Sequence, residues 1–500
     1  MTSRCFLRVA GSLFLGFATI AVAAAAPSRR INPLALPDYP IGRSVRDVAP
    51  GQPNDPAGLW LSETTQQFRE LADPSALWHE GKWYLYPSVD MAWVSADEGR
   101  TWAHHPLNVR DIGYAPTIVE HRGQFILMAS HSGLYTGPTP LGPFASIGQL
   151  EMPARDGLPP PIDPMLFSDD GRLFYYWGCT PNSGLWGVEL DAVNPTKVIG
   201  EPKELIPFRP DTYLFERVGS ANQNPNTGWM EGPWMIKEGG RYYLTYSAGG
   251  TQYRTYTMGA YVGDSPLGPF KPQQRNPIFR TTEGLITGTA HGCIVRGPRD
   301  RLWVFYTLFA GVAHGFERRV GLDLAAIDEN GELYVPRATS TPQALPDSAS
   351  ADAWLPLNES EPNFGSSSAP NLSGRFAADN ALTTWWQPAA DDPRPTLTAH
   401  FSTRATIHAA RIVWRDVGLD TTAGKNPGAF RYRIEAETAP GEWTTIIDRS
   451  ESAEDFLVDY RECAPVHATR ARLVILGHPP GIQPGVTEFT VFGITGRAGR

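Results

Sequence analysis

Three acidic residues and a histidine stand at the starts of segments that repeat along the chain. Asp73 and Asp163 open two segments as Asp-Pro, and Glu231 and His291 directly precede two later segments. Carboxylates that are crowded together in a partly dry site raise at least one pKa, which gives a proton donor beside a carboxylate that stays ionised. Hydrolysis of a glycosidic bond requires such a pair. The spacing therefore predicts a site for acid and base catalysis.

A purely structural role for these residues is the alternative. Asp-Pro is a common strand-start or turn dipeptide, because Asp bonds its own backbone and Pro lacks a donor. Acids at the same position of three repeats favour a shared site over three separate turns. His291 alone is compatible with a packed core histidine, a substrate contact, or a ligand of water or calcium.

The repeat itself predicts the elements that position these side chains. Each segment has a turn residue seven positions after its second residue, followed by an aromatic or aliphatic strand, which is typical of a β-hairpin. The five segments are 73–88, 115–130, 163–178, 232–247 and 292–307. Five such sheets arranged radially form a five-bladed β-propeller, whose innermost strands line a central channel. The segment starts should then meet at one mouth of the channel.

The rest of the chain indicates a second domain. Residues 345–362 are rich in Ser, Ala, Asp and Pro, which predicts a linker after a propeller over 27–344. Alternating apolar residues over 363–497 predict a separate antiparallel β-sandwich. The expected fold class is all-β. A single S-x-D-x-G-x-T-W run, Ser95 to Trp102, resembles the Asp-box of sialidase propellers and indicates a hairpin turn rather than that activity.

The N-terminus and the composition limit the classes of partner. Two arginines precede an apolar run that ends in small residues at Ala26, which predicts a signal peptide over 1–26 with cleavage after Ala23 or Ala26. An uncleaved membrane anchor is the alternative. We expect a secreted or periplasmic protein with no membrane span after signal removal. The net charge of −9 without a basic stripe argues against a nucleic-acid partner.

Zinc chemistry is not predicted. The sequence contains no C-x-x-C or H-E-x-x-H pattern, and signal removal would leave three cysteines, Cys179, Cys293 and Cys463. An odd number of cysteines without paired spacing indicates buried free thiols rather than a disulfide framework.

The motifs around the acids resemble family 43 of the glycoside hydrolases over about residues 40–340. The matching residues are Ala-Asp-Pro at Asp73, Ile-Asp-Pro at Asp163, Glu-Gly-Pro-Trp from Glu231 and Gly-x-x-His ending at His291. The resemblance implies that Asp73 is the general base, Asp163 modulates a pKa and Glu231 is the general acid of an inverting enzyme. Acids across the channel should then lie about 6.5–9.5 Å apart.

The same resemblance implies the substrate site. Arg318 or Arg319 would contact substrate, Tyr114 would form an aromatic wall, and His291 would face the channel. No cofactor is required, although a calcium ion near His291 would fit the family. The family includes arabinofuranosidases and xylosidases, so we expect release of arabinofuranose or xylose from plant-type polysaccharides or oligosaccharides.

The C-terminal segment resembles a discoidin-like (coagulation factor 5/8 type C) domain, a jelly-roll sandwich that commonly binds glycans. The residues that carry this resemblance are Ser366 to Ala369, Arg375 to Trp386, Ile412 to Trp414 and Val486 to Gly493. The resemblance implies a carbohydrate-binding role. Trp385 and Trp386 could stack on sugar, but at least one of them is expected in the core.

Two other functions remain open. Asn54-Asp55-Pro56-Ala-Gly resembles a motif of a retaining fructan or sucrose hydrolase family, in which Asp55 would be the nucleophile. A non-catalytic carbohydrate-binding surface protein with an inactive propeller is the other alternative. The set of Asp73, Asp163 and Glu231 favours the inverting glycosidase.

Overall fold

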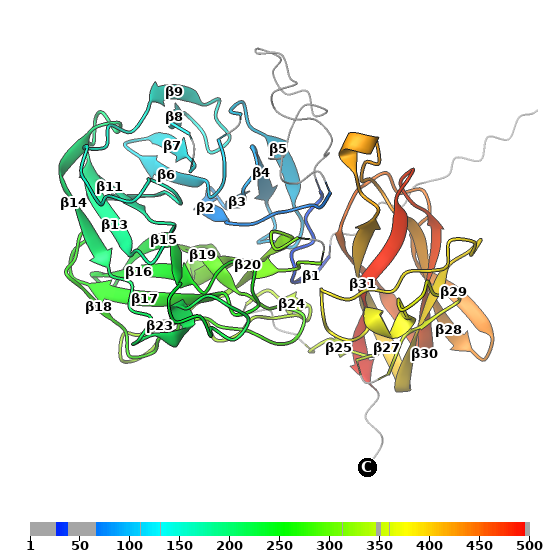
Figure 1. The fold of residues 1–500 in the computed structure, drawn as a ribbon. Helices are drawn as coiled ribbons and strands as arrows, with labels where there is room; N and C mark the ends of the chain where they lie inside the picture. The colour runs from blue at the N-terminus through cyan, green and yellow to red at the C-terminus, as the bar shows by residue number, and fades with distance from the viewer. Residues whose placement is uncertain are drawn as a thin grey trace, which may run out of the picture.

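The computed structural model describes residues 27–38, 67–110, 112–130, 132–312, 314–346, 352–359 and 361–495. The predicted signal peptide and Asp55 lie outside these residues. The chain forms a five-bladed β-propeller, blue to green in Figure 1, and a C-terminal β-sandwich beside it, yellow to red. The predicted all-β fold is confirmed. Among the described residues, no helix is long and apolar enough to cross a membrane.

Each blade is one antiparallel sheet whose strands follow one another in sequence, except that the short β12, between two strands of blade three, pairs with blade four. Blade one contains β2 (Ser75–His79), β3 (Lys82–Tyr86), β4 (Met91–Ser95) and β5 (Ala103–Pro106), and blade two contains β6 (Thr117–His121), β7 (Gln124–Met128), β8 (Leu134–Gly137) and β9 (Ala145–Gly148). Blade three contains β10 (Met165–Asp169), β11 (Arg172–Trp177), β13 (Leu185–Leu190) and β14 (Val198–Ile206). Blade four contains β12 (Thr180–Pro181), β15 (Trp229–Glu238), β16 (Arg241–Ala248), β17 (Thr257–Gly263) and β18 (Phe270–Pro272). Blade five contains β19 (Ala290–Arg296), β20 (Leu302–Phe309) and β21 (Arg318–Leu324).

The first hairpin of every blade turns through two residues that both have positive φ. These pairs are Glu80–Gly81, Arg122–Gly123, Asp170–Gly171, Gly239–Gly240 and Arg299–Asp300. Two positive φ values define a type I′ turn, whose twist matches the twist of the strands that it joins. The five hairpins expected from the repeat are therefore present, with the turns at the predicted positions.

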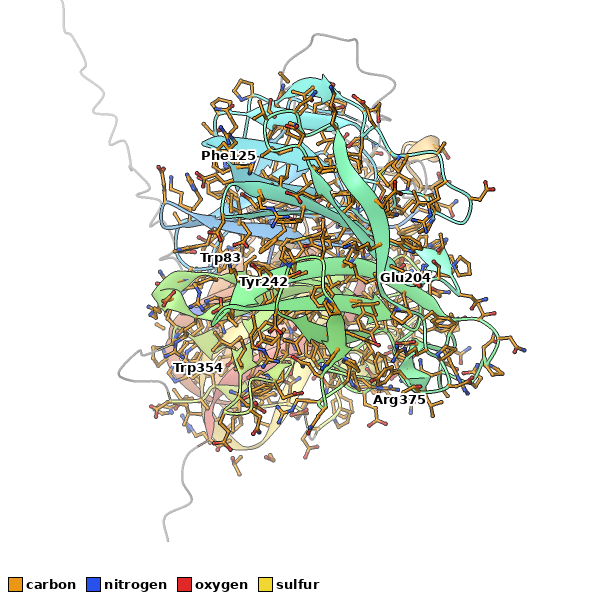
Figure 2. All side chains as sticks on the ribbon, turned by 90° about the vertical axis from the view of Figure 1, so that its left-hand side faces the viewer. Trp83, Phe125, Glu204, Tyr242, Trp354 and Arg375 are labelled. Carbon is orange, nitrogen blue, oxygen red and sulfur yellow. The ribbon has the colours of Figure 1, made fainter. Side chains whose placement is uncertain are left out.

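The two ends of the propeller are joined to each other. The Leu34 N–H donates to the Val320 carbonyl of β21 at 2.9 Å, and the Asn32 side chain accepts a bond from the Leu322 N–H at 2.9 Å. Blades one and five also contact each other directly: Trp83 of blade one packs edge-on against Phe305 of blade five, with ring centroids 5.0 Å apart. The N-terminal segment and blade five thus close the ring. Figure 2 shows the blades in front and the C-terminal domain behind them.

The C-terminal domain has long antiparallel strands in the order β25-β31-β27-β30-β28-β29, and β26 pairs with β27. The strands are β25 (Leu355–Pro356), β26 (Phe364–Gly365), β27 (Thr396–Val417), β28 (Arg431–Ala439), β29 (Glu442–Arg449), β30 (Val458–Gly477) and β31 (Gln483–Thr495). Against β30, the register of β27 shifts between His400 and Ala405 and between Ile407 and Ala409, which are bulges at which a strand can bend. Because β25 already pairs with β31, this sheet begins inside the range expected to be linker.

Candidate active site

Each blade has a residue in the left-handed backbone conformation at its innermost strand, either just before the strand or, for β15 and β19, within its first residues. These residues are Asp73, Ala115, Asp163, Gly232 and His291, with φ between 42° and 55°. His291 thus occupies the position that the sequence repeat assigns to Gly292, because the β19 register shifts between Ala290 and Cys293. A left-handed backbone at a residue other than glycine costs roughly 1–2 kcal/mol, so the surrounding structure must hold it.

A ring of side-chain hydroxyls holds these residues. In four of the five blades, a Ser or Thr near the end of the second strand of the first hairpin accepts a hydrogen bond from the left-handed residue of the next blade. The bonds are Ala115 N–H to Ser88, 3.1 Å; Asp163 N–H to Ser130, 3.1 Å; His291 N–H to Ser247, 2.6 Å; and Asp73 N–H to Thr307, 2.8 Å. The last bond joins blade five to blade one. The hydroxyl ring therefore fixes the backbone of the predicted catalytic positions.

Blade three lacks the hydroxyl because Gly178 stands at that position. Its φ is 152°, and a Cβ there would lie 2.7 Å from the Leu185 side chain. The Gly232 N–H of the next blade instead donates to the Asp163 carboxylate at 3.3 Å. Asp163 thus takes the place of the missing hydroxyl in the ring, so its carboxylate is tied to the backbone directly beside Glu231.

Asp73 is the carboxylate with the strongest positive surroundings. Arg318 donates to both of its oxygens, at 2.7 and 3.0 Å, and the Ser88 hydroxyl donates at 3.0 Å. The His291 Nδ1 lies 3.2 Å from Asp73 Oδ1. Burial opposes ionisation of Asp73, but the charges of Arg318 and His291 outweigh it and hold the pKa of Asp73 below its ordinary value. Asp73 is therefore the group suited to remain ionised and accept a proton.

Asp163 has the opposite tendency. Burial raises the pKa of Asp163 to about 7, and the negative charges of Glu231 and Asp73 add to this, against the charge of His291 and the Gly232 N–H. In addition to the Gly232 N–H, the Ser130 hydroxyl donates to the Asp163 carboxylate, at 3.4 Å. A carboxyl that keeps its proton near neutral pH beside a second carboxylate is the arrangement of an acid pair.

Glu231 is buried and is aimed by a bulge. The register of β15 against β16 shifts between Glu231 and Trp234, and such a bulge redirects the side chain. The Tyr256 hydroxyl donates a short hydrogen bond to one carboxylate oxygen, and the Cys179 thiol donates to the other at 3.2 Å. Both oxygens are thus held, so the carboxyl has a fixed orientation.

The two acids and the thiol form one cluster. Oxygens of Asp163 and Glu231 and the Cys179 sulfur all lie within 4.8 Å of one another. Burial, together with the charges of Asp163 and Glu231, raises the pKa of the Cys179 thiol well above its ordinary value, so the thiol stays protonated. The Trp229 indole N–H donates to the same sulfur at 3.3 Å. Cys179 is thereby placed to donate to Glu231.

His291 lies among the three carboxylates. Besides Asp73, its Nδ1 lies 3.9 Å from Asp163 Oδ2 and 3.5 Å from the Tyr256 hydroxyl. A Cβ on Gly232 would lie 2.9 Å from the imidazole ring, so a glycine is required there by both space and its positive φ. The sequence predicts that His291 faces this site, and the structure brings it together with the three acids.

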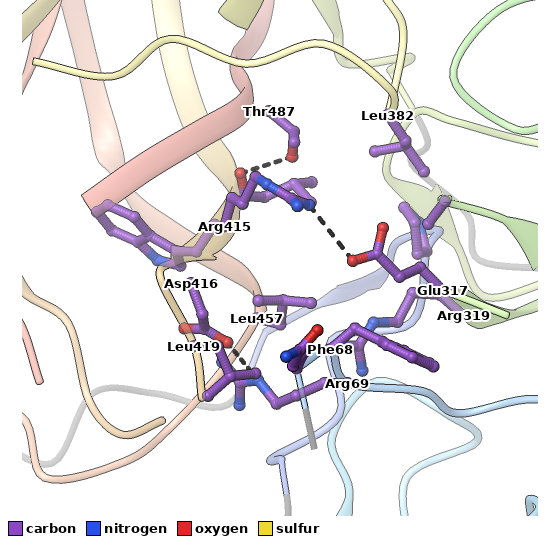
Figure 3. A pocket seen from close by; sticks show the side chains of 15 residues that line it. Phe68, Arg69, Glu317, Arg319, Leu382, Arg415, Asp416, Leu419, Leu457 and Thr487 are labelled. Carbon is purple, nitrogen blue, oxygen red and sulfur yellow. Dashed lines mark hydrogen bonds and ion pairs between the residues drawn. The ribbon is translucent and has the colours of Figure 1, made fainter. Parts of the chain in front are cut away.

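The two adjacent arginines point in different directions, as side chains of a strand do. Arg318 lies on Asp73, whereas Arg319 pairs with Asp38 at 3.3 Å and lines a cavity between the two domains. That cavity, shown in Figure 3, is lined by none of the three acids. Of the two arginines named from the sequence, Arg318 belongs to the cluster of predicted catalytic residues.

Tyr114 contacts the cluster through an acid that the sequence analysis did not single out. Its hydroxyl donates to Glu70 at 3.2 Å, and Glu70 accepts a bond from Arg318 Nε at 2.6 Å. Burial raises the pKa of Glu70 to about 7, because it outweighs the charge of Arg318, with the negative charge of Asp73 adding to the effect. Glu70, Tyr256 and Cys179 lie outside the matched positions of the repeat, so its periodicity does not point to them.

The side chains around His291 do not supply the set of six to eight oxygen ligands that calcium takes. Both oxygens of Asp73 are bound by Arg318, Asp163 binds Gly232 N–H and Ser130, and the Tyr256 hydroxyl is bound to Glu231. We therefore derive no step through a metal.

The comparison with known sequences decides the family. The profile of "Glycosyl hydrolases family 43" matches residues 88–333. The propeller domain belongs to family 43. Asp163, Glu231, His291 and Arg318 lie inside the matched range of this family, and Asp73 lies before it.

Several known proteins resemble the family 43 domain. The chain is 23% identical over 302 residues to a beta-D-galactofuranosidase of Aspergillus niger, covering 52% of this chain and 81% of that protein. It is 26% identical over 264 residues to a beta-xylosidase of Xylanibacter ruminicola, covering 41% of this chain and 78% of that protein. A solved glycoside hydrolase superposes with a TM-score of 0.50 at 19% identity, over 84% of this chain and 97% of that one, which shows a shared fold.

Proposed function

We propose that this family 43 protein is an inverting glycosidase that releases arabinofuranose or xylose from plant-type polysaccharides or oligosaccharides. The observation that carries the proposal is the contrast between two buried carboxyls. The pKa of Asp73 is held low beside Arg318, and the pKa of Asp163, beside Glu231, is raised to about 7. The similarity to a beta-xylosidase supports the choice of sugar.

In the proposed reaction Asp73 is the general base and Glu231 the general acid. Asp73 takes a proton from a water molecule, and the water oxygen bonds to the anomeric carbon while the bond to the leaving oxygen breaks. Glu231 gives its proton to that leaving oxygen. Exchange of protons with solvent restores both groups. One water is consumed for each bond that is cleaved, and the anomeric configuration inverts.

The other residues of the cluster orient these two groups. Arg318 and Ser88 fix the Asp73 carboxylate, while Tyr256 and Cys179 fix that of Glu231. Asp163 is the modulating acid of the proposed set, because its carboxyl lies beside Glu231 and is held there by the Gly232 N–H. His291 and Tyr114 stand where they can bind sugar hydroxyls or form a wall of the site.

The proposed location is outside the cell membrane, secreted or periplasmic, and it rests on the N-terminal sequence pattern alone.

We also propose that the C-terminal domain is discoidin-like and binds carbohydrate. Trp386 is fully buried and Trp385 lies under Arg415, with 4.9 Å between the guanidinium and the ring centroid. A surface pocket lined by residues that include Asp392 and His478 is the better candidate for sugar hydroxyls, and His478→Ala should weaken retention by polysaccharide gels.

The deciding experiment is hydrolysis of nitrophenyl arabinofuranoside, xyloside, galactofuranoside, galactoside and fucoside, with the product anomer followed by NMR. Release of arabinose or xylose in inverted form, slowed in Glu231→Gln, is the expected result. Retention of configuration would overturn the proposal in favour of a double-displacement enzyme. No hydrolysis of these glycosides, or of arabinan, xylan and galactan, would favour a carbohydrate-binding protein.

A further inference from the structure

Two segments of the propeller lie between the catalytic cluster and the C-terminal domain. In each, neighbouring residues face opposite ways. Glu70 and Arg318 face Asp73, whereas Arg69 and Glu317 face the C-terminal domain across the cavity of Figure 3. Each segment therefore contacts the active site on one side and the other domain on its opposite side.

Arg69 is held mainly by the C-terminal domain. Its side chain is 1% exposed, and it donates to Asp416 at 2.6 Å and to Asp455 at 2.8 Å. Asp38 of the N-terminal segment lies 3.3 Å away. A buried guanidinium without its carboxylate partners is strongly destabilising, so these contacts fix where Arg69 can lie.

The second segment has its own contact with the same strand. Glu317 lies 3.5 Å from Arg415, the residue next to Asp416 at the end of β27. The other side of the Arg415 guanidinium is covered by the Trp385 ring. Adjacent residues of one C-terminal strand thus hold both propeller segments.

The two segments are also joined to each other at the catalytic base. The Leu71 N–H donates to the Arg318 carbonyl at 3.1 Å, and the Arg318 guanidinium binds both Glu70 and Asp73. Arg69 and Glu70 are neighbours in the chain, so a shift of Arg69 would also move Glu70. Because Glu70 binds Arg318, the shift would reach Arg318 and the Asp73 carboxylate.

We propose that the C-terminal domain is a positioning part of the active site, in which Asp416 and Asp455 hold Arg69 and so fix Arg318 on Asp73. The inference rests on the proposed function, since it concerns the geometry of its base. It gives this domain a role in the reaction that is separate from any binding of polysaccharide.

The test is Asp455→Asn in the full chain, with kcat, KM and the pH profile measured on the glycoside that the wild type hydrolyses best. Asp455 is the most exposed of the carboxylates that contact Arg69, with its side chain 18% exposed, so its replacement should disturb the fold least. We expect kcat to fall about 10-fold, KM to change less than twofold, and the acidic limb of kcat/KM to move to higher pH, because Arg318 then holds Asp73 less firmly. Asp455→Glu should recover part of the loss.

Asp448→Asn is the matched control, since Asp448 pairs with Arg433 at 3.1 Å on the surface of the same domain. A folded Asp455→Asn with lowered thermal stability but unchanged kcat and acidic limb would overturn the inference and leave the interface a purely structural one. If Asp455→Asn does not fold, Arg415→Gln removes the second contact and must lower kcat in the same way. An inactive wild type would instead overturn the proposed function, so the two failures are distinguishable.

Discussion

Arg318 donates one hydrogen bond to each oxygen of Asp73, at 2.7 and 3.0 Å. A paired contact of this kind fixes the plane of the carboxylate as well as its charge. Glu70 accepts from the remaining guanidinium nitrogen, Nε, so the arginine cannot turn away. The direction in which Asp73 can accept a proton is thereby set before any substrate binds.

Replacement of this arginine should change both the rate and its pH dependence. For Arg318→Lys we expect kcat/KM to fall about 100-fold, the usual scale for loss of one fixed donor in an active site. The single point charge of lysine lowers the pKa of Asp73 less, so the acidic limb of the profile should move to higher pH. Arg296→Lys, at an exposed pair with Glu238, is the control. An unchanged acidic limb would show that Asp73 is not the group that titrates there.

Glu231→Gln should distinguish protonation of the leaving group from other effects. We expect kcat on alkyl glycosides to fall by a factor of about 10²–10⁴, since the amide cannot donate a catalytic proton. The loss should be much smaller on dinitrophenyl glycosides, because that leaving group departs without a proton. The control is Glu238→Gln. Glu238 lies at the end of the same strand and pairs with Arg296 at the surface, so its replacement should leave kcat unchanged. Equal losses on both substrates would contradict the role of Glu231 as the acid.

The pH dependence of stability follows from Asp163. Its pKa is raised in the folded protein to about 7, so its contribution to stability is fully present below its ordinary pKa and is lost as the pH rises through about 7. We expect the thermal midpoint to fall between about pH 4 and pH 7, and the fall to be smaller in Asp163→Asn. Activity should decline over the same upper range as the acid pair loses its proton. Identical midpoints for wild type and variant at every pH would show that Asp163 does not titrate there.

The hydroxyl ring can be tested away from the reacting groups. Ser130→Ala leaves the buried Asp163 N–H without its acceptor, which should lower the free energy of unfolding by about 1–3 kcal/mol. Urea denaturation measures the change, and Ser146→Ala, at an exposed position of β9, is the matched control. Equal stability of the two variants would mean that the ring does not hold the blade starts. Gly178→Ser should also destabilise, because a Cβ there meets Leu185.

The repeat predicted the blades and the three acids because both depend on local pattern. Type I′ turns need residues that tolerate positive φ, and strands need alternating apolar residues, so both leave a signal in the sequence. The position of His291 was less well predicted, since a bulge shifts it by one residue relative to the repeat.

The remaining parts of the site depend on contacts between distant segments. Tyr256 lies just before a third blade strand, and Cys179 follows the end of a repeat, so neither occupies a repeated position. Arg69 meets Asp416 and Asp455, which lie 347 and 386 residues further along the chain. No periodicity connects such partners, and the interface between the domains therefore had no signal in the sequence.

The bond from the Asp73 N–H to Thr307 has a consequence for biosynthesis. The proposed general base, Asp73, belongs to the first blade to leave the ribosome, but its backbone is secured by a residue of the last blade, and its carboxylate by Arg318 a little later still. Contacts between residues so far apart in sequence form late, because a long loop must close first. The active site is then assembled at the end of synthesis, and an incomplete chain carries the acids without the geometry that makes them a catalyst.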